Sequence, residues 1–301
     1  MTTSANTAKR GPNLAGYLLV ALSAVTFSAK GIFAKIIYAH GVDPITLLAL
    51  RFAMTMPLFW LTLHFYPSGA LEKRDVPLLL VIGLTGFYSA ALLDFYGLLH
   101  IEATLERLII YTYPAAVVIL AAVFLKERVG PAKVVSIVLT YAGLAVSLRV
   151  WKGGGGGGSL LGAGLVFSAA ALYSVSYIVM EVLGRRVSAI KISTWATTIA
   201  GAAFIATWHF RSWPTEPVVW LNLAGLAVVS TYLPILTLLP GIKMIGASRS
   251  ALASFVGPVS TALLAMAVLG ETFDRVEAAG MAVVIAGVVM LTRDRHPRPR
   301  P

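Results

Sequence analysis

Long apolar runs alternate with short polar breaks along the whole chain. Each run has roughly the 20 residues that an α-helix needs to cross the hydrocarbon core of a membrane. The breaks carry charged residues, prolines and glycines, which end helices, as at Asp43-Pro44 and Lys126-Glu127-Arg128. The pattern predicts an all-α membrane protein with ten transmembrane helices, at about residues 14–38, 45–65, 76–99, 103–125, 132–150, 160–183, 192–210, 218–239, 247–269 and 276–292.

The composition agrees with lipid as the solvent of this chain. Of its 301 residues 58% are hydrophobic and 12% are charged, whereas soluble domains carry about 25% charged residues. Ten spanning helices use about 200 residues, which leaves no room for a separate soluble domain. The absence of cysteine excludes a disulfide framework and a thiolate metal site.

The net charge of +11 is unevenly placed along the chain. With the N-terminus inside, 16 Lys and Arg fall on inner segments and 6 on outer segments and helix ends. Cytoplasmic loops of membrane proteins carry such an excess, so the charge does not indicate a nucleic-acid partner. We therefore expect a multi-pass protein of the bacterial inner membrane with both termini in the cytoplasm.

One stretch of the sequence occurs twice, at a spacing of 144 residues. Residues 97–147 align with residues 241–291 without a gap, and 11 of 51 positions are identical. The residues that interrupt helices or resist lipid recur in the same order: Gly97, Pro114, Glu127 and Gly143 fall on Gly241, Pro258, Glu271 and Gly287. A repeat of this kind sets the architecture of the protein.

Each repeat holds five predicted helices, and five is an odd number. The second repeat must therefore enter the membrane from the opposite side, which is the inverted-repeat pattern of secondary transporters. The predicted organisation is a cytoplasmic tail (1–12), a first five-helix repeat (13–150), a Gly-rich linker (151–159), a second repeat (160–292) and a basic cytoplasmic tail (293–301). We interpret the six glycines at 153–158 as a flexible linker rather than a phosphate-binding loop.

Several short motifs now carry a family resemblance. They are Phe27 to Gly31 followed by Lys35, then Arg51-Phe52, the proline within the fourth and ninth helices, LKERV or LGETF, and YAGLAV or IAGVVM. In these motifs the chain resembles the EamA-type transporters of the drug/metabolite transporter superfamily, including the YddG-type exporters of aromatic amino acids. The resemblance implies an inverted repeat of ten helices, with the first, third, fourth, sixth, eighth and ninth around a central cavity.

Charged residues within spans are candidates for a binding site, because they cost free energy unless they are paired or face water. Lys30, Asp94 and Arg107 each lie a few residues from the outer ends of their helices, at similar depth. Two interpretations remain open, a structural ion-paired plug and a charged collar for a zwitterionic substrate. We interpret Arg51 as structural, because its helix is expected at the periphery. Asp94 and Glu181 are taken as the deep carboxylates.

Aromatic and small polar side chains recur at helical spacing in four of the spans. Tyrosine is common at membrane interfaces, and packing explains many such stripes, but a tyrosine hydroxyl deep in a span needs a partner. Together with Lys30, Asp94 and Arg107, the residues proposed to bind substrate are Phe27, Tyr88, Tyr96, Tyr111, Tyr173, Ser176 and Tyr177.

Pro114 and Pro258 fall in the middle of predicted helices at matched positions of the two repeats. A proline inside a helix removes a backbone hydrogen bond and bends the helix. We therefore expect two kinks that serve gating. Glu127 is read as a solvated loop charge, with a helix-end anchor as the alternative.

These features favour a secondary transporter that exports small amphipathic metabolites, above all amino acids, by alternating access. The alternatives are a multidrug or organic-cation exporter and a non-transporting scaffold or flippase-like protein. No nucleophile–base pair, metal cluster or nucleotide loop emerges, so we expect neither an enzyme nor a bound cofactor or metal. The expected partners are a small-molecule substrate and membrane lipid, and the sequence leaves the oligomeric state open.

Overall fold

The computed structural model describes residues 13–66, 71–101, 106, 109–147, 160–208, 213–269 and 275–292. Arg107, Glu271, the glycine run and both tails lie outside these residues, so the predictions made for them stay predictions. Within the described residues the chain is helical and contains no strand. Six helical stretches there are long and apolar enough to cross a membrane, and the others are shorter apolar helices.

The apolar runs fold into the ten spans, several of them built from consecutive helices. The first repeat contains α1 (Leu14–Phe27) and α2 (Lys30–Ala39), α3 (Pro44–Phe65), the series η1 (Lys73–Asp75), α4 (Val76–Val81), η2 (Ile82–Ser89) and α5 (Ala90–Gly97), then α7 (Tyr113–Phe124) and α8 (Pro131–Ser147). The second contains α9 (Leu160–Gly184), α10 (Ala189–Trp208), the series α11 (Pro217–Ala227), η4 (Val228–Tyr232) and α12 (Leu233–Ile245), then α13 (Ala247–Ala253), α14 (Val256–Leu269) and α15 (Arg275–Thr292).

The start of α3 illustrates how the polar breaks set the helix ends. Gly41 adopts a positive φ of 75°, which glycine accepts without strain. The Asp43 carboxylate then accepts hydrogen bonds from the backbone N–H groups of Ile45 and Thr46, at 3.0 and 3.1 Å. Pro44 occupies the first helical turn, where a missing N–H is harmless. Residues 41–44 thus end one span and begin the next.

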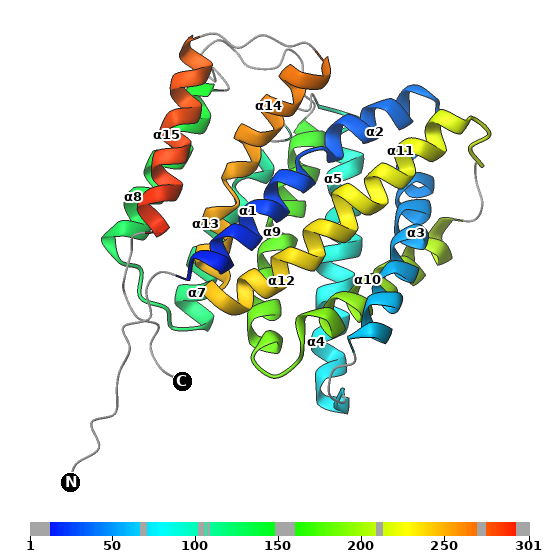
Figure 1. Ribbon diagram of the computed structural model, residues 1–301, viewed down its shortest axis with the longest axis horizontal. Helices are drawn as coiled ribbons and strands as arrows, with labels where there is room; N and C mark the ends of the chain where they lie inside the picture. Colours follow the sequence, from blue (N-terminus) through cyan, green and yellow to red (C-terminus); the bar gives the residue numbers. More distant parts are fainter. Residues whose placement is uncertain are drawn as a thin grey trace.

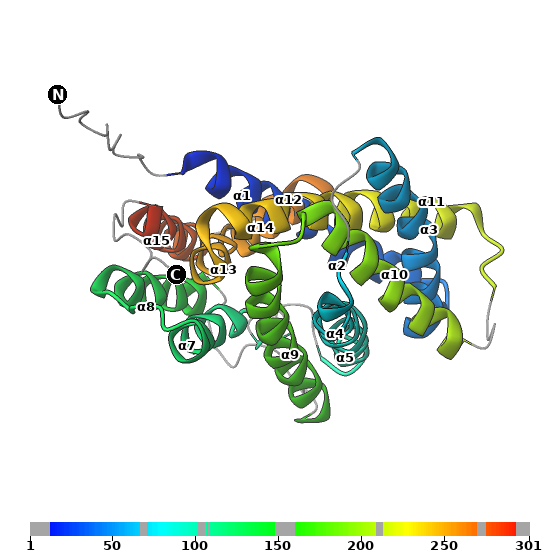
Figure 2. The same ribbon diagram turned by 90° about the horizontal axis from the view of Figure 1, so that it is seen from below.

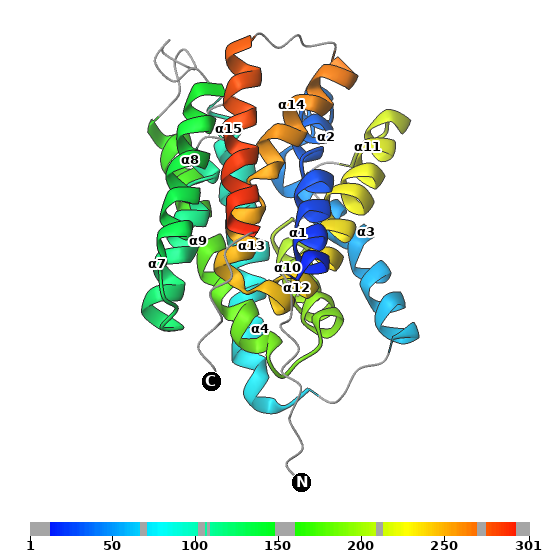
Figure 3. The ribbon, with the colours of Figure 1, turned by 60° about the vertical axis from the view of Figure 1, so that its left-hand side comes forward.

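The spans pack into one bundle, with α8 and α15 paired along one edge (Figure 1). At the opposite edge α3 lies beside α10 and α11, and α9, α1 and α12 occupy the middle (Figures 1 and 2). The first residues of α1 and the last residues of α15 lie at the same end of the bundle (Figure 3). This placement agrees with an even number of spans.

The two repeats exchange their first helices. A Cβ atom on Gly16 of α1 would lie 2.6 Å from Ile245 Cγ2 of α12, and one on Gly162 of α9 would lie 2.7 Å from Ile101 Cγ2, just beyond α5. Ile101 and Ile245 are 144 residues apart, the spacing of the sequence repeat. Each first helix therefore packs against the third span of the other repeat, through glycine contacts that hold the helices close.

The fifth helices of the repeats pair with each other in the same symmetric way. A Cβ on Gly143 of α8 would lie 2.7 Å from the carbonyl oxygen of Gly280 on α15, and a Cβ on Gly287 would lie 3.2 Å from that of Ser136. The Ser136 hydroxyl donates to the Gly287 carbonyl at 2.9 Å. The glycines singled out by the repeat thus mark the contacts between the halves.

Pro114 and Pro258 do not lie inside continuous helices as predicted, but the fourth and ninth spans are each interrupted directly before the proline, at residues 111–112 and 254–255. The chain turns just before each of them, so both prolines lie in the first turn of a new helix, α7 and α14. The N–H groups of a first turn have no partner inside the helix, so proline removes no hydrogen bond there. The prolines inside continuous helices are Pro57 of α3 and Pro240 of α12. The latter helix also continues beyond its predicted end, to Ile245.

Two π-helical segments, η2 and η4, interrupt the third and eighth spans at corresponding positions of the two repeats. Residues 84–88 of η2 match residues 228–232 of η4 at the spacing of 144. Such segments inside α-helices are frequent at functional sites. The first supplies Gly86 and Phe87 to the wall of the cavity described next, and the second hydrogen-bonds Arg51 of that wall.

Candidate functional site

Two adjoining cavities lie in the middle of the bundle, with volumes of about 90 and 100 Å³. They share a wall that both repeats supply: Phe27, Lys30, Ile110, Tyr173, Ile235 and Leu238. The first cavity extends to Arg51, Phe87 and Asp94. The second extends to Glu106, Tyr111 and Tyr177. Since one water needs roughly 10–15 Å³ by this kind of measure, each cavity has room for several waters or a small ligand.

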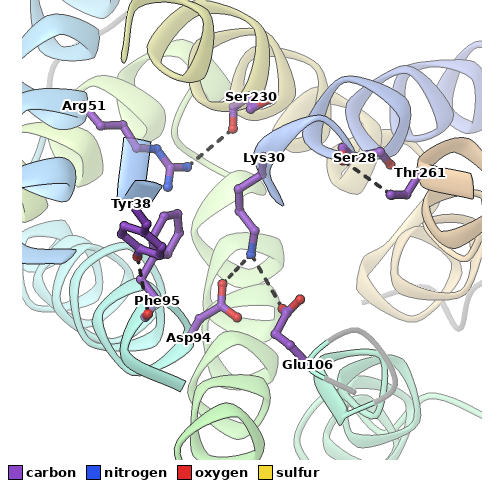
Figure 4. Close-up of polar contacts among 9 residues, drawn as sticks. All are labelled: Ser28, Lys30, Tyr38, Arg51, Asp94, Phe95, Glu106, Ser230 and Thr261. Atoms are coloured by element: carbon purple, nitrogen blue, oxygen red, sulfur yellow. Dashed lines mark hydrogen bonds and ion pairs between the residues drawn. The ribbon is translucent and has the colours of Figure 1, made fainter. Parts of the chain in front are cut away.

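Lys30 lies at the boundary of the two cavities, where it faces two carboxylates (Figure 4). Its ammonium group forms an ion pair with Asp94 Oδ2 and lies 3.8 Å from Glu106 Oε1. It also lies 5.1 Å from the ring centre of Phe27 and 5.3 Å from that of Phe95, within the range of cation–π attraction. All three charged residues are buried, and together they join the first, third and fourth spans.

Glu106 is the carboxylate that the sequence analysis missed. Its side chain is 5% exposed. The sequence pattern pointed to its neighbour Arg107, which lies outside the described residues and stays a prediction. Ile110, four residues after Glu106, lines both cavities. Because residues i and i+4 share a helix face, this spacing is the feature of the sequence that relates Glu106 to the cavities.

The helix of Arg51, α3, lies at the edge of the bundle as expected (Figure 1), but the Arg51 side chain lines the first cavity. The residue is 4% exposed. Its Nε donates to Thr231 Oγ1 at 2.5 Å and its Nη2 to the Ser230 carbonyl at 3.4 Å, so η4 holds the guanidinium in place. Its Cζ lies 5.5 Å from the ring centre of Phe95, the ring that Lys30 also faces (Figure 4).

Tyrosines line the second cavity. Tyr113, Tyr173 and Tyr177 form a triangle of ring contacts with centroids 5.2 to 5.4 Å apart. Tyr111 lies beside them, 6.2 Å from Tyr113. The structure thus brings together the predicted Tyr111, Tyr173 and Tyr177, and it adds Tyr113. The Tyr113 hydroxyl also hydrogen-bonds that of Ser254 on the other repeat.

Three predicted site residues do not line either cavity. Tyr88 packs against Phe204 of α10, with ring centroids 4.5 Å apart. The Ser176 hydroxyl pairs with that of Thr85 at 2.9 Å, between α9 and η2. Tyr96 is half-buried on α5, outside the lining of both cavities.

The charged set belongs to one repeat. In the first helices, Gly16 matches Gly162 and Val20 matches Val166, a spacing of 146 that also matches Phe27 with Tyr173. By the same spacing, Lys30 corresponds to Ser176, and by the spacing of 144, Asp94 corresponds to Leu238 and Glu106 to Ser250. The ion-paired set at the start of α2 therefore comes from the first repeat alone, and the second repeat has neutral residues at the equivalent positions.

The opposite end of the bundle, where α13 begins, is tied by different carboxylates. Glu181 of α9 accepts a hydrogen bond from the Ala247 N–H at 2.5 Å. Glu127 accepts from Lys133 and from the Ser248 hydroxyl, both at 2.7 Å. Glu127 is therefore an anchor for α8 and α13, and its reading as a solvated loop charge is wrong.

The family comparison assigns this architecture. The model of the EamA-like transporter family matches both halves of the chain, at residues 14–149 and 160–293. The chain belongs to the EamA-like transporter family. This confirms the predicted family, and it makes the protein a multi-pass membrane transporter.

Individual relatives agree with this assignment. The uncharacterized transporter YcbK of Bacillus subtilis is 28% identical over 278 residues, which cover 88% of this chain and 89% of the relative. A probable terminal-alkyne amino-acid exporter of Streptantibioticus cattleyicolor is 26% identical over 233 residues, which cover 74% and 75%. A solved structure described as "Crystal structure of protein" has a TM-score of 0.77 at 20% identity, covers 92% of this chain and is itself covered to 98%. That last similarity shows the fold alone.

Proposed function

We propose that this EamA-like transporter exports small zwitterionic metabolites, namely amino acids, across the bacterial inner membrane by alternating access. The observation that carries the proposal is the chemistry of the cavity wall. Cations (Lys30 and Arg51) and carboxylates (Asp94 and Glu106) meet there among aromatic rings. A ligand with one charge of each sign and an apolar body matches this lining, because both of its charges find partners when they leave water.

Two closures support alternating access around this cavity. The ion pairs of Lys30 join three spans on one side, and Glu127 and Glu181 hold the start of α13 on the other. Transporters of this type rock one repeat against the other around a fixed site near the middle of the membrane. The excess of Lys and Arg at the α13 end favours that end as cytoplasmic, with both termini inside. The Lys30 set would then close the outer side.

One relative supports the substrate class. The Streptantibioticus cattleyicolor protein is named a probable terminal-alkyne amino-acid exporter. An amino acid with an apolar side chain is the kind of molecule that the charged and aromatic wall of the cavity would accept here.

The second carboxylate at the cavity favours one alternative, a multidrug or organic-cation exporter. Glu106 and Asp94 together could attract a cation, but Lys30 lies between them and Arg51 adds a further positive charge. A scaffold without transport has no use for four buried charges around a cavity, so we give this alternative no further weight.

Counterflow in liposomes tests the proposal. Purified protein is reconstituted with an excess of one unlabelled compound inside, and entry of the labelled compound is followed for apolar amino acids, organic amines and nucleosides. We expect entry of apolar amino acids well above that of protein-free liposomes, and none for nucleosides. Exchange of amines without exchange of amino acids would favour the organic-cation exporter instead.

A further inference from the structure

Arg51 is a buried cation that forms no ion pair with any residue in the described parts of the chain. Its two hydrogen bonds go to neutral oxygens, Thr231 Oγ1 and the Ser230 carbonyl. A guanidinium has five N–H donors and always carries its charge. Its remaining donors and its charge are therefore available at the wall of the first cavity. Removal of an ion from water is costly unless an opposite charge accompanies it, so the site is suited to an anion.

Asp94 supplies the complementary feature at the same cavity. Its Oδ2 pairs with Lys30, but its Oδ1 is buried without a hydrogen-bond partner among the described residues. The residue is 6% exposed and lines the first cavity together with Arg51. Buried carboxylate oxygens are rarely left without a donor, so this oxygen can accept a hydrogen bond from an N–H group of a ligand.

We propose that Arg51 binds the carboxylate of a transported amino acid and that Asp94 Oδ1 binds its ammonium group. The inference rests on the proposed function and names the two charged contacts of that site. Lys30 is not the carboxylate ligand, because Asp94 and Glu106 already face its charge. The planar guanidinium of Arg51 is also better matched than an ammonium group to the two oxygens of a carboxylate.

The rest of the first cavity defines the side chain of the substrate. Beyond the charged residues its wall is apolar and includes Phe87, Ile235 and Leu238. An aliphatic or aromatic side chain would lie against this wall. Asp94 is the one carboxylate in the described lining of the first cavity, so a lysine or arginine side chain would bring a second cation that this cavity does not pair, and we expect basic amino acids to bind less tightly than apolar ones.

The experiment measures binding of three related probes to the full-length protein in detergent by isothermal titration calorimetry. The probes are L-leucine, 3-methylbutylamine, which lacks the carboxylate, and 4-methylpentanoate, which lacks the amine. The variants are Arg51→Met, Arg51→Lys and Asp94→Asn. Arg186→Met is the matched control, because it removes an arginine that pairs with Asp75 at 2.5 Å and neither residue lines a cavity.

We expect Arg51→Met to lower the affinity for leucine and for 4-methylpentanoate at least about tenfold, which corresponds to the loss of one charge-assisted contact. The affinity for 3-methylbutylamine should stay unchanged. Asp94→Asn should weaken leucine and the amine and spare the acid. The affinity of Arg51→Lys for leucine and 4-methylpentanoate should lie between those of the wild type and Arg51→Met. If Arg51→Met fails to fold, Arg51→Lys alone tests the assignment. Arg186→Met should bind all three probes as wild type does.

Three contrary results have different meanings. If the wild type binds leucine and Arg51→Met binds it equally well, the assignment of Arg51 is overturned while amino-acid transport stands. If Arg51→Met weakens all three probes alike, the residue acts on the fold and not on the carboxylate. If the wild type binds no amino acid but moves another metabolite in counterflow, both the inference and the proposed function fail.

Discussion

Tyr111 and Phe255 occupy the same position in the two repeats, and their rings stack on each other with centroids 5.7 Å apart and planes 29° from parallel. Equivalent residues of an inverted repeat can touch only near its symmetry axis, so this pair marks where the axis passes through the bundle. Tyr111 also lines the second cavity. The cavity is thus built around the axis about which the halves would move.

The exchange of first helices predicts a sharp difference between two glycines of α9. A Cβ added to Gly162 would meet His100 and Ile101 at 2.7 Å, whereas nothing lies within 4 Å of one added to Gly164. Gly162→Ala should lower stability by about 1–3 kcal/mol through overpacking. Gly164→Ala is the matched control and should be neutral or slightly stabilising. Melting curves of the two purified variants make the comparison, and equal melting temperatures would argue against the helix exchange.

The ion pair between Lys30 and Asp94 predicts that the stability lost on removing Lys30 is regained when Asp94 is removed as well. Lys30→Met leaves Asp94 buried without its ammonium partner and should destabilise the protein by about 3 kcal/mol. Adding Asp94→Leu, the residue that the second repeat has at Leu238, removes the charge of Asp94, the nearer of the two carboxylates that Lys30 faces. The double variant should recover most of the lost melting temperature. A double variant as unstable as the sum of both single changes would show that the pair contributes nothing as a pair.

The first-turn positions of Pro114 and Pro258 predict that neither is needed for a bend. Pro114→Ala and Pro258→Ala, singly or together, should leave the initial transport rate within about twofold of wild type, because no helical hydrogen bond is gained in a first turn. Rates are measured at equal amounts of folded protein. A severe loss in the double variant would restore the hinge role that the sequence suggested.

The positions of Lys and Arg predict the orientation in the membrane. Fusions of a reporter that fluoresces only in the cytoplasm should be bright at both the N-terminus and the C-terminus. The even number of spans requires the two ends to agree, and the charge difference decides on which side they lie. A bright fusion at one end with a dark, well-expressed fusion at the other would contradict the ten-span topology.

The fold could be read from the sequence because its signals are local or repeated. Apolar runs of spanning length gave the helices, and the Gly–Pro–Glu–Gly order at a spacing of 144 gave the inverted repeat. The site was harder, because the face that a residue turns to its neighbours depends on packing between distant helices. The depth of Lys30 and Asp94 in their spans places both at one site, but finding Glu106 required the direction of one helix face.

Arg51 and the prolines show the same limit in different ways. Nothing local reveals that η4 of the other repeat would hold the Arg51 guanidinium beside the cavity. A proline in an apolar run fits both a kinked helix and a new helix after a turn, and only the backbone at residues 111–112 and 254–255 distinguishes them.

The most direct test is whether amino acids pass through the cavity at all. Ile110 lines both cavities, so Ile110→Trp should fill the shared space while an apolar side chain is kept. Leucine counterflow is measured in liposomes that contain wild-type or Ile110→Trp protein of matched melting temperature. If amino acids pass through the cavity, the wild type should exchange leucine rapidly and Ile110→Trp should lose most of that exchange. Exchange at the wild-type rate in Ile110→Trp, or none in the wild type, would contradict it.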